Sequence, residues 1–248
     1  MAGHSKWANI KRQKARVDAK KNKTFTQLSR AIIVAARNGI PDPQGNFQLR
    51  TAIAKAKSAG VPNDNIAKSI AKGAGTYQEA GAVLEEIRYE GYGAGGVAIL
   101  IEALTDNRNR SAADIRAAFS KNGGNLGETG CVGWMFEQKG VVTLEGKINE
   151  DTLLEIALEA GAENYELIAE TDFTGAEIIT ATTNVENLAQ TLQDHGLTVT
   201  ESELCWLASN TVEVESEAQK RSLIKTISTL EALDDVQNVT TNCQLTNF

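Results

Sequence analysis

Positive and negative side chains are segregated along this 248-residue chain. Residues 1–75 contain 15 of the 25 Lys and Arg but only 3 of the 32 Asp and Glu, which is a formal charge of +12 against −19 for the remainder. The net charge of −7 therefore conceals a cationic end. Such asymmetry is typical of a protein that binds a polyanion with one end while the other end does something else.

The most basic stretch, residues 10–23, has no apolar stripe that a helix could bury, because its cations fall around most of the helical circumference. We expect this arm to be mobile alone and to become ordered when phosphates supply the counter-charge. Trp7 precedes it and could stack on an unpaired base. The alternative is that Trp7 packs on the helices that follow and the charges form a solvated surface. The nucleic-acid-binding candidates in this arm are His4, Ser5, Lys6, Trp7, Lys11, Arg12, Lys14, Arg16, Lys20, Lys21 and Lys23.

Three short helices are predicted next, over residues 25–39, 46–59 and 62–72. The first turns Phe25, Leu28 and Ile32 inward. We expect a small bundle with a cationic outer surface. Three cations spaced by seven share the outer face of the first helix and join the candidates: Lys23, Arg30 and Arg37.

The period changes to that of strands after residue 75, with strands predicted over 83–92 and 97–104. The glycines at 91, 93 and 96 between them match a dinucleotide-binding fingerprint in form only, since that site needs a helix after the last glycine and a strand follows here. A glycine-rich hairpin is favoured, and no cofactor is expected.

Ser111 is predicted to cap a helix, with Asp114 in capping-box position, and a further strand is expected over residues 133–137. Arg108 and Arg110 precede the expected cap, in a position suited to phosphate. They are equally suited to pairing with local acids such as Glu102 or Asp106, so both interpretations stay open.

Residues 140–208 have the order strand, helix, strand, strand, helix, strand, which is the ferredoxin-like βαββαβ arrangement. A helix and a strand after residue 208 cannot bury their apolar faces alone, so we assign them to the incomplete unit before residue 140. The predicted fold is α+β with three domains: a basic helical domain (1–78), a discontinuous α/β domain (79–139 plus 209–248) and an acidic ferredoxin-like domain (140–208) inserted in it. Residues 140–208 hold 14 acids and a single Lys, so this domain should repel nucleic acid.

Residue usage argues against catalysis and against a metal centre. The chain has only two His and three widely spaced Cys, which we expect to be reduced, half-buried thiols. Carboxylate pairs such as Asp234 and Asp235 are adjacent, would point to opposite faces of a strand, and are assigned no chemistry. No apolar run suits a signal peptide or a membrane helix, so we expect a cytoplasmic protein that does not enter a membrane.

Several stretches resemble the YebC family, which includes the mitochondrial translational activator of cytochrome c oxidase. They are residues 1–11 (MAGHSKWANIK), 61–66 (VPNDNI), 89–96 (YEGYGAGG), 102–110 (EALTDNRNR) and 233–239 (LDDVQNV). The resemblance spans nearly the whole chain and implies a helical N-terminal domain, two α/β domains and a regulatory role without catalysis.

Two functions follow. The first is that of a DNA-binding transcriptional regulator, as the family is commonly described. The second is that of a translation factor that binds the ribosome or its RNA and relieves stalling on proline-rich stretches, as other members of the family are described. No helix with a base-reading set of Asn, Gln and Arg can be picked out, so contact with the nucleic-acid backbone should dominate in either case.

Overall fold

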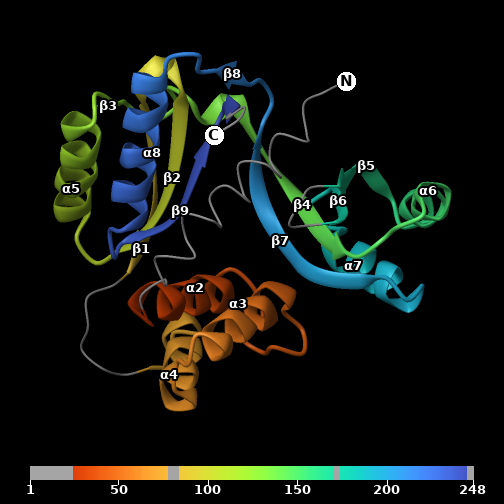
Figure 1. The fold of residues 1–248 in the computed structure, drawn as a ribbon. Coiled ribbons are helices and arrows are strands. Elements are labelled where there is room, and N and C mark those ends of the chain that lie inside the picture. The colour runs from red at the N-terminus through yellow and green to blue at the C-terminus, as the bar shows by residue number, and fades with distance from the viewer. Residues whose placement is uncertain (1–24, 78–83, 170–173, 245–248) are drawn as a thin grey trace. The chain divides into compact units, whose positions relative to one another are not determined.

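A computed structural model describes residues 25–77, 84–169 and 174–244 of the chain (Figure 1). Helices come first and two four-stranded antiparallel sheets follow, which confirms the predicted mixed α+β fold. The chain divides into two compact units. Residues 137–207 form one unit, and the other contains the described residues before and after them.

The N-terminal helices are α2 (Phe25–Arg37), α3 (Phe47–Ser58) and α4 (Asn63–Gly73), close to the predicted ranges. Their shared core contains Leu28 and Ile32 from α2, Leu49 from α3 and Ile66 from α4. Phe25 was predicted to face inward, but it is 51% exposed, because the apolar stripe of α2 begins only at Leu28.

Two residues fix how these helices meet. A Cβ on Gly73 would lie 2.6 Å from the Ala36 side chain and 2.6 Å from the Ile33 carbonyl oxygen, so only glycine lets α4 approach α2 this closely. The buried Asn46 caps α3 by accepting from the Leu49 amide at 3.0 Å, and its amide group donates to the Ala35 carbonyl at 2.7 Å. The end of α2 and the start of α3 are thereby joined.

The first sheet has the order β3-β1-β2-β9, built from β1 (Glu85–Tyr92), β2 (Ala98–Thr105), β3 (Asn125–Leu126) and β9 (Val236–Thr241). A short turn at Ala94–Gly96 joins β1 to β2. This is the predicted glycine-rich hairpin, and Gly95 has the positive φ of 77° that such a turn requires.

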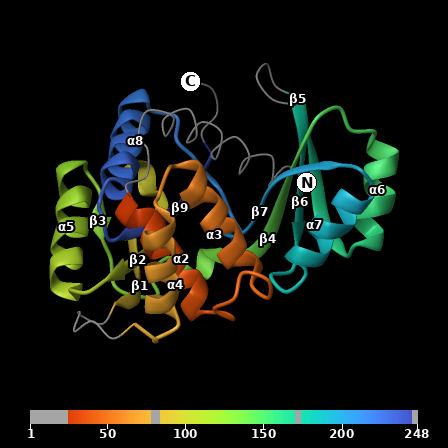
Figure 2. The same cartoon turned by 90° about the horizontal axis from the view of Figure 1, so that it is seen from below.

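Helices α5 (Arg108–Lys121) and α8 (Glu217–Glu231) cover one face of this sheet, as Figures 1 and 2 show. Ile115 and Phe119 of α5 pack with Leu223 of α8 and Ile101 of β2 in one core. The prediction that Ser111 caps α5 is wrong. Asn107 is the cap and accepts from the Arg110 amide at 3.1 Å, so the helix begins one turn earlier than expected.

The strand predicted over residues 133–137 is wrong for its first three residues only. Residues 133–135 form a single 3₁₀ turn, and one long strand, β4 (Phe136–Glu145), follows it. The buried Glu90 explains the turn, because its carboxylate accepts from the amides of Gly130, Val132 and Gly133 at 2.8, 2.7 and 2.6 Å. These bonds hold the loop away from extended pairing. A two-stranded parallel pair, β8 (Val212–Glu213) and β10 (Cys243–Gln244), completes this unit.

The unit of residues 137–207 contains the second sheet, in the order β5-β6-β4-β7. Its elements are β4, α6 (Glu150–Glu159), β5 (Ala162–Ala169), β6 (Thr174–Thr180), α7 (Val185–Asp194) and β7 (Thr198–Ala208). This order is that of the predicted ferredoxin-like arrangement. Because β9 returns to the first sheet after β7, the topology supports our proposal that the acidic domain is an insertion.

Candidate nucleic-acid interface

The described helical part keeps the predicted excess of positive charge. Residues 25–76 contain seven Lys and Arg and only two acids. Lys57 at the end of α3 and Lys68 and Lys72 of α4 are exposed. The Lys72 ammonium lies 5.1 Å from the centre of the Tyr77 ring, a contact that keeps this cation at the end of α4.

A groove of about 610 Å³ lies along α3 and α4 and is called the α3/α4 groove below. Ile53, Ile66 and Ile70 supply apolar lining, and Arg50 and Lys57 supply cations. The Arg50 guanidinium donates to the Pro43 carbonyl at 2.9 Å and the Gln44 carbonyl at 3.0 Å, which anchors the loop before α3. Lys57 is the cation of this groove that is both exposed and outside such a loop anchor.

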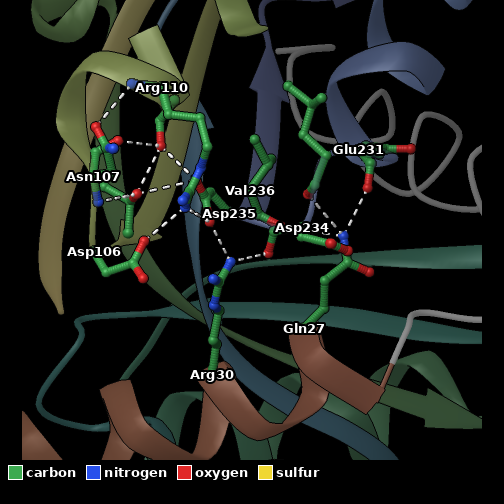
Figure 3. Close-up of polar contacts among 12 residues, drawn as sticks. Gln27, Arg30, Asp106, Asn107, Arg110, Glu231, Asp234, Asp235 and Val236 are labelled. Carbon is green, nitrogen blue, oxygen red and sulfur yellow. Dashed lines mark hydrogen bonds and ion pairs between the residues drawn. The ribbon is translucent and has the colours of Figure 1, made fainter. Parts of the chain in front are cut away.

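Arg30, from the middle of α2, is paired with an acid of the α8–β9 turn (Figure 3). Its guanidinium Nη1 lies 2.6 Å from Asp235 Oδ1, and it also donates to the Asp234 carbonyl oxygen. The two side chains are only 14% and 9% exposed. Gln27, one turn earlier, donates to the carbonyls of Glu231 at 2.8 Å and Leu233 at 3.1 Å.

Asp235 also receives groups from the start of α5. Arg110 Nη2 lies 3.0 Å from Asp235 Oδ2 and 2.7 Å from Asp106 Oδ1. The hydroxyls of Ser111 and Thr105 donate to Asp235 Oδ2 at 2.5 and 3.0 Å. We call Asp235, Arg30, Arg110, Ser111 and Thr105 the Asp235 cluster. It joins α2, α5, the end of β2 and the start of β9.

The ionisation of this cluster follows from its contacts. Burial by itself would raise the pKa of Asp235, but the bonds from Ser111, Arg110 and Thr105 and the charge of Arg30 outweigh it, so this pKa is lowered. The same bonds to Asp235 and Asp106 raise the pKa of Arg110. The carboxylate therefore stays charged and both arginines stay engaged.

The other two described candidates are nearby. Arg37 donates to the Leu84 carbonyl at 2.6 Å, just before β1. The Arg108 Nε lies 3.6 Å from Glu85 Oε2, and its side chain remains 69% exposed. Arg108 is thus accessible to an external anion, whereas Arg30 and Arg110 hold Asp235.

The comparison with known families now decides the relationship. Residues 5–76 match the TACO1/YebC protein N-terminal domain, and residues 84–243 match the TACO1/YebC second and third domain. The chain belongs to the TACO1/YebC family.

Relatives and a solved structure agree with this assignment. TACO1/YebC relatives named as probable transcriptional regulatory proteins include one from Rippkaea orientalis and one from Gloeothece citriformis. The first is 68% identical, and the match covers 99% of this chain and 96% of the relative. The second is 70% identical, and the match covers 98% of this chain and 95% of the relative. The crystal structure of a conserved hypothetical protein from Aquifex aeolicus matches with a TM-score of 0.79 at 40% identity, covering 94% of each chain.

The sequence prediction of TACO1/YebC membership is confirmed, but its site residues divide into three groups. Eleven candidates lie outside the described residues: His4, Ser5, Lys6, Trp7, Lys11, Arg12, Lys14, Arg16, Lys20, Lys21 and Lys23. Arg30 and Arg37 were expected on the outer face of the first helix. This is wrong for Arg30, which is 14% exposed and pairs with Asp235, whereas Arg37 is exposed and donates to the Leu84 carbonyl. Arg108 and Arg110 contact acids, which is the second of the two interpretations, with Glu85 and Asp235 as partners that the sequence did not suggest.

Sequence reasoning missed Asp235 itself. It was assigned no chemistry because adjacent carboxylates on a strand point to opposite faces, whereas Asp235 lies in the turn just before β9, which begins at Val236. The prediction that all three cysteines are half-buried is also wrong for two of them. Cys205 and Cys243 are buried, and Cys131 is half-buried. Across residues 25–77, 84–169 and 174–244, no group of three or more His, Cys, Asp or Glu is placed to hold a metal ion.

Proposed function

We propose that this TACO1/YebC-family protein is a non-enzymatic regulatory protein of the cytoplasm that binds nucleic acid through its N-terminal quarter. Its relatives are named as probable transcriptional regulatory proteins, which favours duplex DNA as the target. No helix in the described part of the chain combines the length and the apolarity that crossing a bilayer demands.

One observation carries the proposal. Residues 25–76 keep seven cations against two acids, whereas residues 140–208 hold 14 acids and one Lys. A polyanion is attracted to the first region and repelled by the second, so the protein presents one end to the nucleic acid. The basic arm of residues 10–23 extends the same positive region in sequence.

The contacts within the helical part indicate which cations serve this role. Arg30, Arg37 and Arg50 all donate to acceptors of the protein itself. Lys57, Lys68 and Lys72 are exposed, and we assign the phosphate contacts of this region to them. An ammonium group is a strong point charge for phosphate and reads no base pattern by itself, so the contact should be insensitive to sequence.

Ribosomal RNA is the second candidate target, and the same lysines favour it. Binding through phosphates without base reading serves structured RNA as well as it serves DNA. Translational control through the ribosome would therefore use the same surface as transcriptional control.

The test is fluorescence anisotropy of labelled duplex DNA and of a structured ribosomal RNA fragment, titrated with the full chain at one salt concentration and then in a salt series. Each lost phosphate contact should reduce the slope of log affinity against log salt by about 0.9 on B-DNA. We expect Lys57→Ala and Lys68→Ala to weaken binding to every sequence alike. Lys147→Ala removes the same charge from an exposed site in the acidic unit and is the matched control.

Equal weakening by Lys57→Ala and Lys147→Ala would show that only net charge matters and would contradict the proposed surface. The comparison of the two nucleic acids decides the target, and sedimentation with ribosomes decides whether the RNA is ribosomal in the cell. Sequence-dependent binding to duplex DNA without ribosome co-sedimentation would support transcription. Co-sedimentation lost on deletion of residues 1–23 would support translation.

A further inference from the structure

Helix α6 has a second apolar face that its own sheet does not bury. Leu153, Ile156 and Ala157 are buried against the unit of residues 137–207. Leu154 and Leu158 lie on another side of the helix and are 40% and 67% exposed. Because they are four residues apart, they form one continuous stripe along α6.

Acidic residues border this stripe. Asp151, Glu155 and Glu159 of α6 are all exposed, and no basic residue occurs in the helix. α6 thus presents two leucines with a row of carboxylates along one side, which is the pattern of an amphipathic helix that binds an apolar groove with a basic edge.

The α3/α4 groove has the complementary character. Its lining includes Ile53, Ile66 and Ile70, with Lys57 and Arg50 as its charged members. The groove has a volume of about 610 Å³ and is open to solvent along its length. Phosphates satisfy the cations of such a groove but leave the exposed parts of Ile53 and Ile70 in water, whereas the leucine stripe of α6 would cover them as well.

We propose that α6 of one copy of this protein docks in the α3/α4 groove of a second copy. Leu154 and Leu158 contact the half-buried Ile53 and Ile70 of the groove, and the carboxylate of Glu155 lies beside the Lys57 ammonium. The partner is a second copy because this chain carries both an acidic helix with exposed leucines and a groove with an exposed lysine, which have opposite charge and matching apolar character. The interface joins two different surfaces and is therefore heterologous.

This contact goes beyond the proposed function and has a consequence for it. Lys57 would serve both the acidic helix and the nucleic acid, so self-association and polyanion binding compete for one groove. The acidic unit then acts as a reversible cover for the cationic helices of another molecule.

Sedimentation velocity of the full chain without nucleic acid, over a concentration series, tests the proposal. We expect the sedimentation coefficient to rise with concentration and the association to weaken in high salt. Leu158→Ala should weaken it about tenfold, because the leucine side chain loses most of its burial in the interface. Ile40→Ala is the matched control, since Ile40 is 60% exposed and lies outside both surfaces.

A charge exchange sharpens the test. Glu155→Lys and Lys57→Glu should each abolish association of the pure variant, and mixing the two variants should restore it through the reversed pair. Both positions are exposed, so neither change disturbs a core.

A sedimentation coefficient that does not depend on concentration would overturn the proposal, and so would a Leu158→Ala variant that associates like Ile40→Ala. Since no nucleic acid is present, either result leaves the anisotropy titrations of the proposed function unaffected. The two proposals can therefore fail separately.

Discussion

Asp235 should hold the N-terminal helices to the first α/β sheet, and Asp235→Asn tests this role with little change in shape. The wild-type carboxylate accepts from Arg30, Arg110, Ser111 and Thr105, and its side chain is 9% exposed. The amide of asparagine keeps one acceptor oxygen but loses the charge that attracts both guanidinium groups.

The magnitude follows from the burial of the partners. Breaking a buried ion pair by removing one member costs about 3–5 kcal/mol. Arg30 is 14% exposed and regains some water, which places Asp235→Ala near the lower limit, at about 3 kcal/mol. Asp235→Asn keeps a hydrogen-bond acceptor for the two hydroxyls, so we expect about 2 kcal/mol. Asp234→Asn is the matched control, because that side chain is exposed and should change stability by less than about 0.5 kcal/mol.

Hydrogen exchange read by mass spectrometry locates the effect, and urea denaturation measures its size. Asp235→Asn should speed exchange in α2 and in the first turn of α5, where its partners lie, and leave residues 137–207 unchanged. The pKa of Asp235 is lowered in the folded protein. The ionised carboxylate therefore contributes fully to the free energy of unfolding above the pKa of Asp in the unfolded chain, about 3.9, and this contribution is lost as pH falls through the folded pKa. The difference between wild type and variant should thus be constant from about pH 5 to 8 and shrink below about pH 4. Equal losses for Asp235→Asn and Asp234→Asn would refute the reasoning.

Three further outcomes are expected. Glu90→Gln should destabilise the chain by about 2 kcal/mol in urea denaturation, because an amide nitrogen would face backbone donors in the loop of residues 130–133; no loss would contradict the role given to Glu90. The pKa of Glu90 is lowered because the bonds from these amides outweigh the effect of burial. The stability that the Glu90 carboxylate contributes should therefore be lost only as pH falls through its folded pKa, and the stability of Glu90→Gln should lack this dependence on acid. Burial raises the pKa of Cys243 to about 11, so an alkylating reagent should label Cys243 at pH 8 only in denaturant, as read by mass spectrometry. Rapid labelling of the native chain would contradict the burial of this thiol. Ser111→Ala should lower the free energy of unfolding by about 1–2 kcal/mol, because it removes a buried donor to Asp235. If Ser111 capped α5 instead, the substitution would speed amide hydrogen exchange in the first turn of that helix.

Local periodicity was sufficient to predict most of the fold. α3 and α4 were located within a residue or two because their apolar positions recur at helical spacing and because Asn46 and Pro62 mark their starts. The order of elements in residues 140–208 likewise predicted the ferredoxin-like arrangement, with which the observed sheet order β5-β6-β4-β7 agrees. Both features depend on the spacing and order of residues that are close in the sequence, so the sequence alone predicts them.

The errors arose where distant residues decide the local structure. Ser111 has the side chain of a helix cap, but Asp235, 124 residues away, binds its hydroxyl, and Asn107 caps α5 in its place. The loop of residues 130–135 follows the carboxylate of Glu90, some 40 residues earlier, and therefore does not extend as a strand. No pattern within one segment encodes such a partner.

The positive charge of the N-terminal quarter also depends on partners that are distant in the sequence. Counting cations treats arginine and lysine alike, yet in residues 25–76 the structure uses them differently. All three arginines there donate to the protein, to Asp235, to Leu84 or to the loop before α3. A planar guanidinium can satisfy several fixed acceptors at once, which suits it to holding elements together, whereas the ammonium of an exposed lysine remains hydrated and available to a phosphate. Substituting arginines in this region should therefore alter stability first and affinity only as a consequence, and substituting the exposed lysines should alter affinity alone.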